Sequence, residues 1–281
     1  LKMNKKTKTE LELTDLSSLV KFTYDIMNMH PDTQAPFIGK SAFAHKGGVH
    51  VSAVMKDSNM YEHIDPELVG NKQRVLVSDL SGKSNINFKA NELDIKYKDS
   101  KEITGQLVSK VKDLEFEGYQ FEAADASLEL ILRELSGEYI PFFKVLDSKV
   151  HISYDESGTE KADATLKVLV GDDIEHTASD GDGPVDALNN ALRKALAIFF
   201  PELKDVRLTD YKVRVLNEQE GTGAKVRVLI ESAYEDDSWS TIGVSKNIIE
   251  ASRQALSDSF NYRLAKLSNW DIKNKKSLQL S

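Results

Sequence analysis

Side chains that can move protons lie close together in the sequence, around a pair of glycines. His45 and His50 flank Gly47-Gly48, and Tyr61 follows a short distance along the chain. An imidazole titrates near neutral pH, so proton transfer is the chemistry to expect of these histidines, with a phenol to assist it. Reactive polar residues among glycines are typical of a site on a loop. The same residues are equally compatible with two loop histidines that make ordinary hydrogen bonds.

The spacing of the two histidines argues against a metal centre. His45 and His50 are separated by glycines and by five positions, so neither a helix nor a strand places both on one face. The sequence contains no H-x-H or H-E-x-x-H pattern and no cysteine. We therefore expect no metal site in this chain.

Helices are expected before and after these residues. Apolar residues recur at helical spacing over 13–29, 103–114 and 121–135. Pro31 and Pro36 end the first of these helices. The first half of the chain is therefore predicted to be mostly helical.

Between the first two of these helices, a short helix is expected just after the glycine pair. Val51, Val54 and Met55 would form its apolar face. Met55 and Met60 are interpreted as core residues, because methionine fills irregular gaps well. A short strand is expected over 74–77.

After Pro141 the pattern changes to strands followed by a helix, and it does so twice. The two predicted βββα units span about 142–203 and 204–266. Similar residues recur at an offset of 60 positions, for example Val168 with Val228 and Ala191 with Ala251. A three-stranded unit with one helix leaves sheet surface uncovered, so two units are expected to pair, within or between chains.

The composition is that of a globular α+β protein rather than a nucleic-acid or membrane protein. With 281 residues and a net charge of −8, the chain is large enough for more than one domain and does not favour nucleic acid as a partner. No apolar run is long enough to span a membrane, and the absence of cysteine is consistent with a cytoplasmic location. The first residue is Leu1, so we expect a piece of a longer protein. We predict a helical linker region over 1–138 and a second domain, made of the two repeats, over 139–281.

Two stretches of the sequence resemble a known enzyme family. The run GKSAFAHKGGVHVSAVMK and the segment from Tyr61 to Gly70, YEHIDPELVG, are similar to the linker region of the α-isopropylmalate and homocitrate synthase family, and most of all to its citramalate synthases. The resemblance extends over nearly all of the chain.

The resemblance implies a catalytic role for two of the residues above. In this family a linker histidine and tyrosine of one subunit enter the metal-dependent TIM barrel of the other, and these fall on His50 and Tyr61. The chain itself lacks the barrel's arginine-aspartate pair and H-x-H motif, and has no room for a barrel of about 250 residues. We therefore expect a homodimer whose divalent metal lies in the missing barrel, and a chain that is inactive by itself.

The expected reaction is the condensation of acetyl-CoA with pyruvate to citramalate, in isoleucine biosynthesis. Two alternatives remain: a 2-isopropylmalate synthase that uses 2-oxoisovalerate and responds to leucine, and a free-standing amino-acid sensor that binds another protein. The intact His50 and Tyr61 stretch argues against the sensor.

The resemblance also implies that the repeat binds an end-product amino acid near a dimer interface, isoleucine or else leucine. Such a ligand needs donors for its carboxylate, an acceptor for its ammonium group and an apolar pocket. The family motifs place the contacts at Val185, Asp186, Leu208, Tyr211, Val215, Thr222 and Val226. Several have simpler interpretations: Leu208, Val215 and Val226 as core, Asp186 as a favourable charge in a first helical turn, and Thr222 as part of a hairpin loop.

Overall fold

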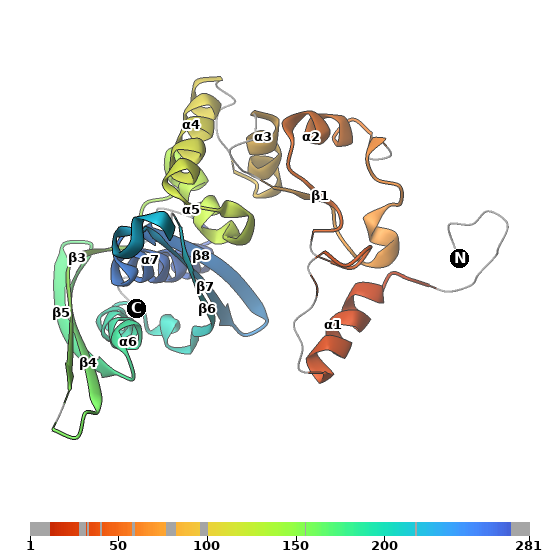
Figure 1. Cartoon of the computed structure of the whole chain (residues 1–281). Helices are drawn as coiled ribbons and strands as arrows, with labels where there is room; N and C mark the ends of the chain where they lie inside the picture. The colour runs from red at the N-terminus through yellow and green to blue at the C-terminus, as the bar shows by residue number, and fades with distance from the viewer. Residues whose placement is uncertain are drawn as a thin grey trace. The chain divides into compact units, whose positions relative to one another are not determined.

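The structure is a computed structural model, and it describes residues 12–27, 32, 34–39, 41–57, 60–76, 83–95, 101–154, 156–216 and 218–270 (Figure 1). The chain forms two compact units, Leu1–Lys89 and Ala90–Ser281, which are described separately. The predicted boundary near residue 138 stays a prediction. The tail after Trp270 lies outside the described residues.

The first unit contains short elements connected by ordered turns. The helices are α1 (Leu16–Ile26), α2 (Gly48–Val54), the 3-10 helix η2 (Pro66–Val69) and most of α3 (Lys83–Glu92). Strands β1 (Ala44–His45) and β2 (Arg74–Val75) pair in parallel. The predicted helix over 13–29, the short helix after the glycines and the strand near residue 74 are confirmed within these bounds.

A small apolar core holds this unit together. Its buried members come from the residue before β1 and from α2, η2, β2 and α3: Phe43, Val51, Val54, Val69, Val75 and Ile86. The interpretation of Met55 and Met60 as core residues is wrong, because their side chains are 50% and 62% exposed. Met55 is the residue at the C-terminal cap of α2, beyond the turn whose valines face inward.

The second unit begins with helices and continues with the two repeats. Its first elements are α4 (Lys101–Glu117), the 3-10 helix η3 (Phe121–Ala123) and α5 (Asp125–Leu135). The first repeat is β3 (Phe143–Tyr154), β4 (Glu160–Val170), β5 (Asp173–Gly181) and α6 (Pro184–Ala197). The 3-10 helix η4 (Pro201–Asp205) leads to the second repeat, β6 (Arg207–Val215), β7 (Val226–Tyr234), β8 (Asp237–Ser245) and α7 (Ile248–Leu267), with η5 (Glu218–Gly223) between β6 and β7. The α+β class and the duplicated βββα order are confirmed.

Each repeat is a three-stranded antiparallel sheet with its strands in sequence order and one helix across a face. The first strand of each sheet lies at an edge and has a bulge at the same place, at Leu146 in β3 and at Thr209 in β6. Side chains from both sheets, both helices and α5 form one continuous apolar core. Figure 1 shows α6 beside the β3–β5 sheet and α7 beside β6–β8.

The two repeats are related by 64 positions and not by the predicted 60. Thr177 in β5 donates to the carbonyl of Ala191 in α6 at 2.9 Å, and Thr241 in β8 makes the same bond to Ala255 in α7 at 2.8 Å. The donor and the acceptor of the second bond each lie 64 positions after those of the first. A shift of four residues keeps the same helix face and the same strand face, so apolar patterns also match at the wrong offset.

The edge strand of the second sheet, β8, is covered by α5. Ser127 of α5 accepts a hydrogen bond from the backbone N–H of Ile242 at 3.1 Å and donates to Asp258 of α7 at 2.7 Å. One hydroxyl therefore links α5, β8 and α7. The helix α5, predicted as part of a linker, packs on the regulatory repeat.

A pH-dependent stability follows from Asp258. Burial raises the pKa of its carboxyl to about 7; the hydrogen bond from Ser127 opposes the rise, and the negative charge of Glu134 adds to it. As pH increases from about 4 to 7, the unfolded chain releases this proton before the folded chain does, so ionisation favours unfolding. As pH rises over this range, the free energy of unfolding of the wild-type chain should fall relative to that of Asp258→Asn. The slope should stay below about 1.4 kcal/mol per pH unit, because the difference between the two states is at most one proton. Urea unfolding of both proteins between pH 4 and 8 measures the difference, and parallel curves would contradict it.

A close approach of β8 to α7 gives a second stability prediction. A Cβ added to Gly243 would lie 2.0 Å from the carbonyl oxygen of Ala251. Gly243→Ala must push the strand from the helix and should cost about 1–3 kcal/mol. Gly105→Ala is the control, because Gly105 lies within α4 with nothing within 4 Å of its added Cβ, and it should stabilise the chain by about 0.5–1 kcal/mol. Urea midpoints that move in the same direction for both variants would contradict the interpretation.

A network around Arg133 stabilises the start of the second unit. The guanidinium of Arg133 donates to Glu129 at 2.8 Å, to Glu138 at 3.0 Å and to the carbonyl of Leu93 at 2.6 Å. Arg133 and Glu129 are both buried. Buried charges of this kind require such partners.

None of the helices in the described parts of the chain is long and apolar enough to cross a membrane.

Candidate functional site

His50 and Tyr61 lie against each other in the first unit. Their ring centroids are 4.4 Å apart and the ring planes differ by 28°, which is a stacked arrangement. Both side chains are exposed, Tyr61 to 48%. The structure therefore brings the two predicted catalytic residues together, with both polar groups open to a ligand or partner.

A short parallel ladder fixes the backbone on the His50 side of this stack. The N–H of Leu76 donates to the carbonyl of His45 at 2.9 Å, next to the β1–β2 pairing. The buried side chain of Asn85 donates to the carbonyls of Lys46 at 2.8 Å and Leu76 at 3.0 Å. After this anchored turn, α2 begins at Gly48 and places His50 in its first turn. The site is thus carried by a helix start rather than by the expected loop.

His45 does not share a surface with His50. Its Nε2 lies 2.9 Å from Oε1 of Glu62, and the side chains of His45 and Glu62 are only 11% and 3% exposed. His63 packs instead against Phe37, with ring centroids 5.5 Å apart. Of the three histidines in this stretch, His50 is the one in the stack.

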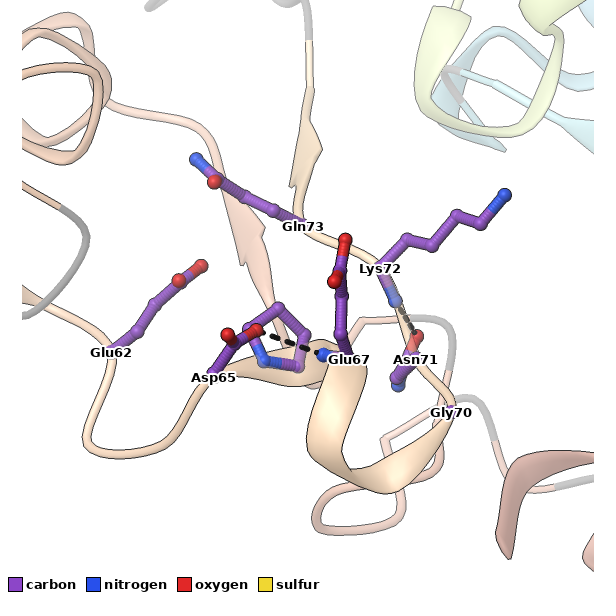
Figure 2. A pocket seen from close by; sticks show the side chains of 8 residues that line it. Glu62, Asp65, Glu67, Gly70, Asn71, Lys72 and Gln73 are labelled. Atoms are coloured by element: carbon purple, nitrogen blue, oxygen red, sulfur yellow. Dashed lines mark hydrogen bonds between the residues drawn. The ribbon is translucent and has the colours of Figure 1, made fainter. Parts of the chain in front are cut away.

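Sequence reasoning missed Glu62. The position of Glu62 directly after Tyr61 was the available signal. Nothing in the sequence pairs Glu62 with His45, which lies 17 positions earlier. Beside it lies a cavity of about 670 Å³ lined by Glu62, Asp65, Pro66, Glu67, Gly70, Asn71, Lys72 and Gln73. Figure 2 shows the Asp65 carboxylate bonded to the backbone N–H of Glu67, at 3.0 Å, beside the Glu62 side chain. This bond caps η2 and fixes the turn that follows Tyr61 and Glu62.

Exposed apolar side chains lie near the stack in sequence. Val49 is 79% exposed, and Met55, Met60 and Leu68 are also exposed. The first unit therefore presents the imidazole and the phenol in a segment that also exposes several apolar side chains.

The predicted effector residues of the second repeat share one face of its sheet. Tyr211 pairs with Ile230 and Val215 pairs with Val226, and antiparallel partners point to the same side. The Tyr211 hydroxyl lies 2.8 Å from the hydroxyl of Ser252 on α7, so this is the face toward that helix. Leu208 is paired with Ser232 on the same face, beyond the bulge.

These residues are partly covered rather than buried. Leu208, Tyr211 and Val226 pack against the edge of the core, whereas Val215 and Thr222 are exposed. The interpretation as plain core is therefore wrong for Val215. Thr222 lies in η5, the connection at the Val215–Val226 end of the two strands.

Val185 and Asp186 lie in the other repeat, in the first turn of α6. The Asp186 carboxylate accepts hydrogen bonds from the backbone N–H of Asp182 at 3.0 Å and from Asn190 at 3.1 Å. Asp186 therefore fixes the turn before its helix. The hydrogen bonds of Asp186 lie within its own repeat, and the Tyr211–Ser252 contact lies within the other.

Across the described residues, no group of three or more histidine, aspartate or glutamate side chains is placed to hold a metal ion.

Two protein-family models match the chain. The model described as the LeuA allosteric (dimerisation) domain matches residues 122–264, and the model described as homocitrate synthase post-HMGL domain-like matches residues 37–118. The first includes α5 and both repeats, and the second contains the His50–Tyr61 stack.

Curated relatives agree with these matches. The chain is 49% identical to an (R)-citramalate synthase of Geobacter sulfurreducens over 95% of its own length and 51% of that relative. It is also 49% identical to an (R)-citramalate synthase of Aquifex aeolicus, over 90% of this chain and 48% of the relative. A 2-isopropylmalate synthase of Methanocaldococcus jannaschii is 27% identical over 95% of the chain and 48% of the relative.

The chain spans about half the length of these relatives. The resemblance that rested on the stretches around His50 and Tyr61 is confirmed by both models and by these identities. With a match that extends over half of its residues, this chain belongs to the LeuA allosteric (dimerisation) domain family.

Proposed function

We propose that this chain is the linker and allosteric regulatory portion of a citramalate synthase. The whole protein would condense acetyl-CoA with pyruvate, and this chain would contribute two things: a histidine and tyrosine that complete a catalytic pocket, and a sensor for the end product. The observation that carries the first part is the exposed His50–Tyr61 stack, at 4.4 Å, on a surface with exposed apolar side chains.

The chemistry required of the stack is proton transfer. Carbon–carbon bond formation needs a proton removed from the methyl group of acetyl-CoA and a proton supplied to the oxygen of the 2-oxo acid as it becomes an alkoxide. An imidazole suits either transfer near neutral pH. His50 would serve at one of these positions, and the Tyr61 hydroxyl would orient the substrate or assist the same transfer.

The remaining parts of the reaction belong to a barrel outside this chain. We propose that the barrel binds a divalent metal and that a second copy of the protein supplies the stack to it, as a homodimer in the cytoplasm. The printed description of the matched family as a dimerisation domain supports the homodimer. The chain by itself should show no turnover.

The regulatory part of the proposal concerns an aliphatic amino acid. The face that carries Leu208, Tyr211, Val215 and Val226 has apolar side chains and one hydroxyl, and part of it is left open beside α7. Val185 and Asp186 would approach this face from a second copy. The two groups would then meet in a site shared between two copies.

Isoleucine is the proposed effector, and pyruvate the proposed 2-oxo acid. The relatives named (R)-citramalate synthase support this choice at 49% identity, against 27% for the named 2-isopropylmalate synthase. The alternative pair is leucine with 2-oxoisovalerate. Shape alone separates these effectors by only about 1–3 kcal/mol, so binding must be measured for both.

Calorimetry of this chain with isoleucine and with leucine tests the effector. We expect isoleucine to bind more tightly and Val215→Asp to abolish the binding, because a carboxylate would lie in the apolar site. Arg214→Asp, at an exposed position on the opposite face of the same strand, is the matched control for a charge added to β6. Tighter binding of leucine would favour the 2-isopropylmalate alternative, and binding of neither would contradict the regulatory proposal.

A further inference from the structure

Two stretches of backbone must be held together for the His50–Tyr61 stack to exist. One runs from β1 through the glycine pair into α2 and carries His45 and His50. The other follows α2 and carries Tyr61 and Glu62 as neighbours. The stack itself is a contact between two exposed rings, and such a contact contributes only about 0.5–1.5 kcal/mol. A further connection is therefore needed to keep the rings aligned.

The hydrogen bond between His45 and Glu62 joins the same two stretches beneath the surface. Nε2 of His45 donates to Oε1 of Glu62 at 2.9 Å, and both side chains are close to fully buried. His45 is anchored by its carbonyl to Leu76 and by β1 to β2. Glu62 is consecutive with Tyr61, so the direction of its side chain constrains that of the phenol.

The Glu62 carboxylate is costly to bury in this way. Its second oxygen, Oε2, is buried and has no hydrogen-bond partner among the residues that the structure describes. A half-satisfied buried carboxylate is less stable than an apolar side chain of similar size. Stability alone therefore does not explain why a glutamate occupies this position.

A direct role for Glu62 in binding or catalysis does not account for it either. The carboxylate is too little exposed to touch a substrate, with 3% of the side chain accessible. The described residues near it form no metal-binding group. Its one close polar partner is His45, so its effect must pass through that residue and through its neighbour Tyr61.

We propose that His45 and Glu62 are a positioning pair that sets the alignment of Tyr61 against His50. The pair fixes the tautomer of His45 with a hydrogen on Nε2, ties the segment after α2 to β1, and holds the phenol over the imidazole. The inference rests on the proposed function of the stack, because alignment matters only if both rings act on a substrate.

Four variants separate positioning from simple stability. Glu62→Ala and His45→Ala each remove one side of the hydrogen bond. Glu62→Gln keeps an acceptor for His45, and His45→Gln keeps a donor near the position of Nε2. Glu67→Ala is the matched control, since Glu67 is an exposed acid on η2 beside the same cavity.

Alignment of the rings is measured on this chain by NMR, without any activity. Rings 4.4 Å apart give strong nuclear Overhauser contacts between His50 and Tyr61 and ring-current shifts of their protons. We expect both signals to disappear in Glu62→Ala and His45→Ala, and to persist in the two glutamine variants and in Glu67→Ala. Imidazole nitrogen shifts should show His45 protonated on Nε2 in the wild-type chain. Contacts at wild-type strength in both alanine variants would overturn the proposal.

Activity is measured on the longer protein that joins this chain to its catalytic barrel. The alanine variants should lower kcat by about 10–100-fold, as expected for a misplacement on the order of 1 Å, with KM within about 3-fold of wild type. The glutamine variants should recover most of kcat. A purely structural role would instead lower the melting temperature and leave kcat unchanged below it, and that result would also overturn the proposal.

The outcomes also distinguish this inference from the function on which it rests. If Glu62→Ala loses the backbone NMR signals of the first unit, that variant is unfolded. His45→Ala and His45→Gln then test the proposal, because they change the other partner of the hydrogen bond. If His50→Ala leaves turnover unchanged, the proposed function fails, whereas the NMR contacts still show whether the pair aligns the rings.

Discussion

His50→Ala, made in the longer protein that joins this chain to a catalytic barrel, should lower kcat by about 10²–10⁴-fold, the usual contribution of a positioned general acid or base. The variant removes the imidazole and also the surface on which the Tyr61 ring lies, at 4.4 Å. Tyr61→Phe keeps the ring and removes only the hydroxyl, so its effect should be smaller. Steady-state rates with acetyl-CoA and pyruvate measure both.

His63→Ala is the matched control for this experiment. His63 is an exposed histidine in the same segment, and its ring packs on Phe37 rather than on the stack. Its loss should change kcat by less than about 3-fold. Equal losses for His50→Ala and His63→Ala would show that the segment, and not the imidazole of His50, is what matters.

Arg133→Ala should have the largest effect on stability, a loss of about 3–5 kcal/mol in the free energy of unfolding. The reason is the acid that it leaves behind: Glu129 is buried at 5% exposure, and one of its two oxygens accepts from Arg133. Breaking a buried ion pair from one side leaves an uncompensated charge. The variant also loses the contact of the guanidinium with the Trp270 ring, 4.1 Å away.

Urea unfolding of three variants tests this interpretation. The double variant Arg133→Met, Glu129→Leu removes both charges and should lose less stability than Arg133→Ala. Arg214→Ala, at an exposed position on β6, should change the free energy of unfolding by less than about 0.5 kcal/mol. A double variant as unstable as Arg133→Ala would mean that packing of the arginine stem, rather than the unpaired Glu129, dominates.

The helices and strands of this fold could be predicted from the sequence. Which residue of the first repeat matches which residue of the second could not. Strand alternation and helical spacing identified both βββα units, because each face must be apolar where it meets the shared core. The same periodicity could not distinguish an offset of 60 from one of 64, since four residues bring back the same face. The paired threonine bonds, Thr177 to Ala191 and Thr241 to Ala255, and the strand registers define the true relation.

The candidate site shows a similar limit. His50 and Tyr61 were found because their residue types and their surrounding motifs indicate chemistry, and the structure places them in contact. Glu62 was not found, since a buried acid becomes visible only when its partner His45 is seen across 17 positions of chain. The exposed positions of Met55 and Met60 were also missed, because residue type alone does not show which part of a short helix faces outward.

The bulges at Leu146 and Thr209 bear on how copies of this protein associate. Each interrupts the regular row of N–H and C=O groups along an edge strand, and a regular row is the template on which strands of other molecules add in open-ended, fibre-like growth. We expect such sideways polymerisation to be disfavoured at both edges. Association of copies is then left to side-chain faces, which can be satisfied by a closed pair.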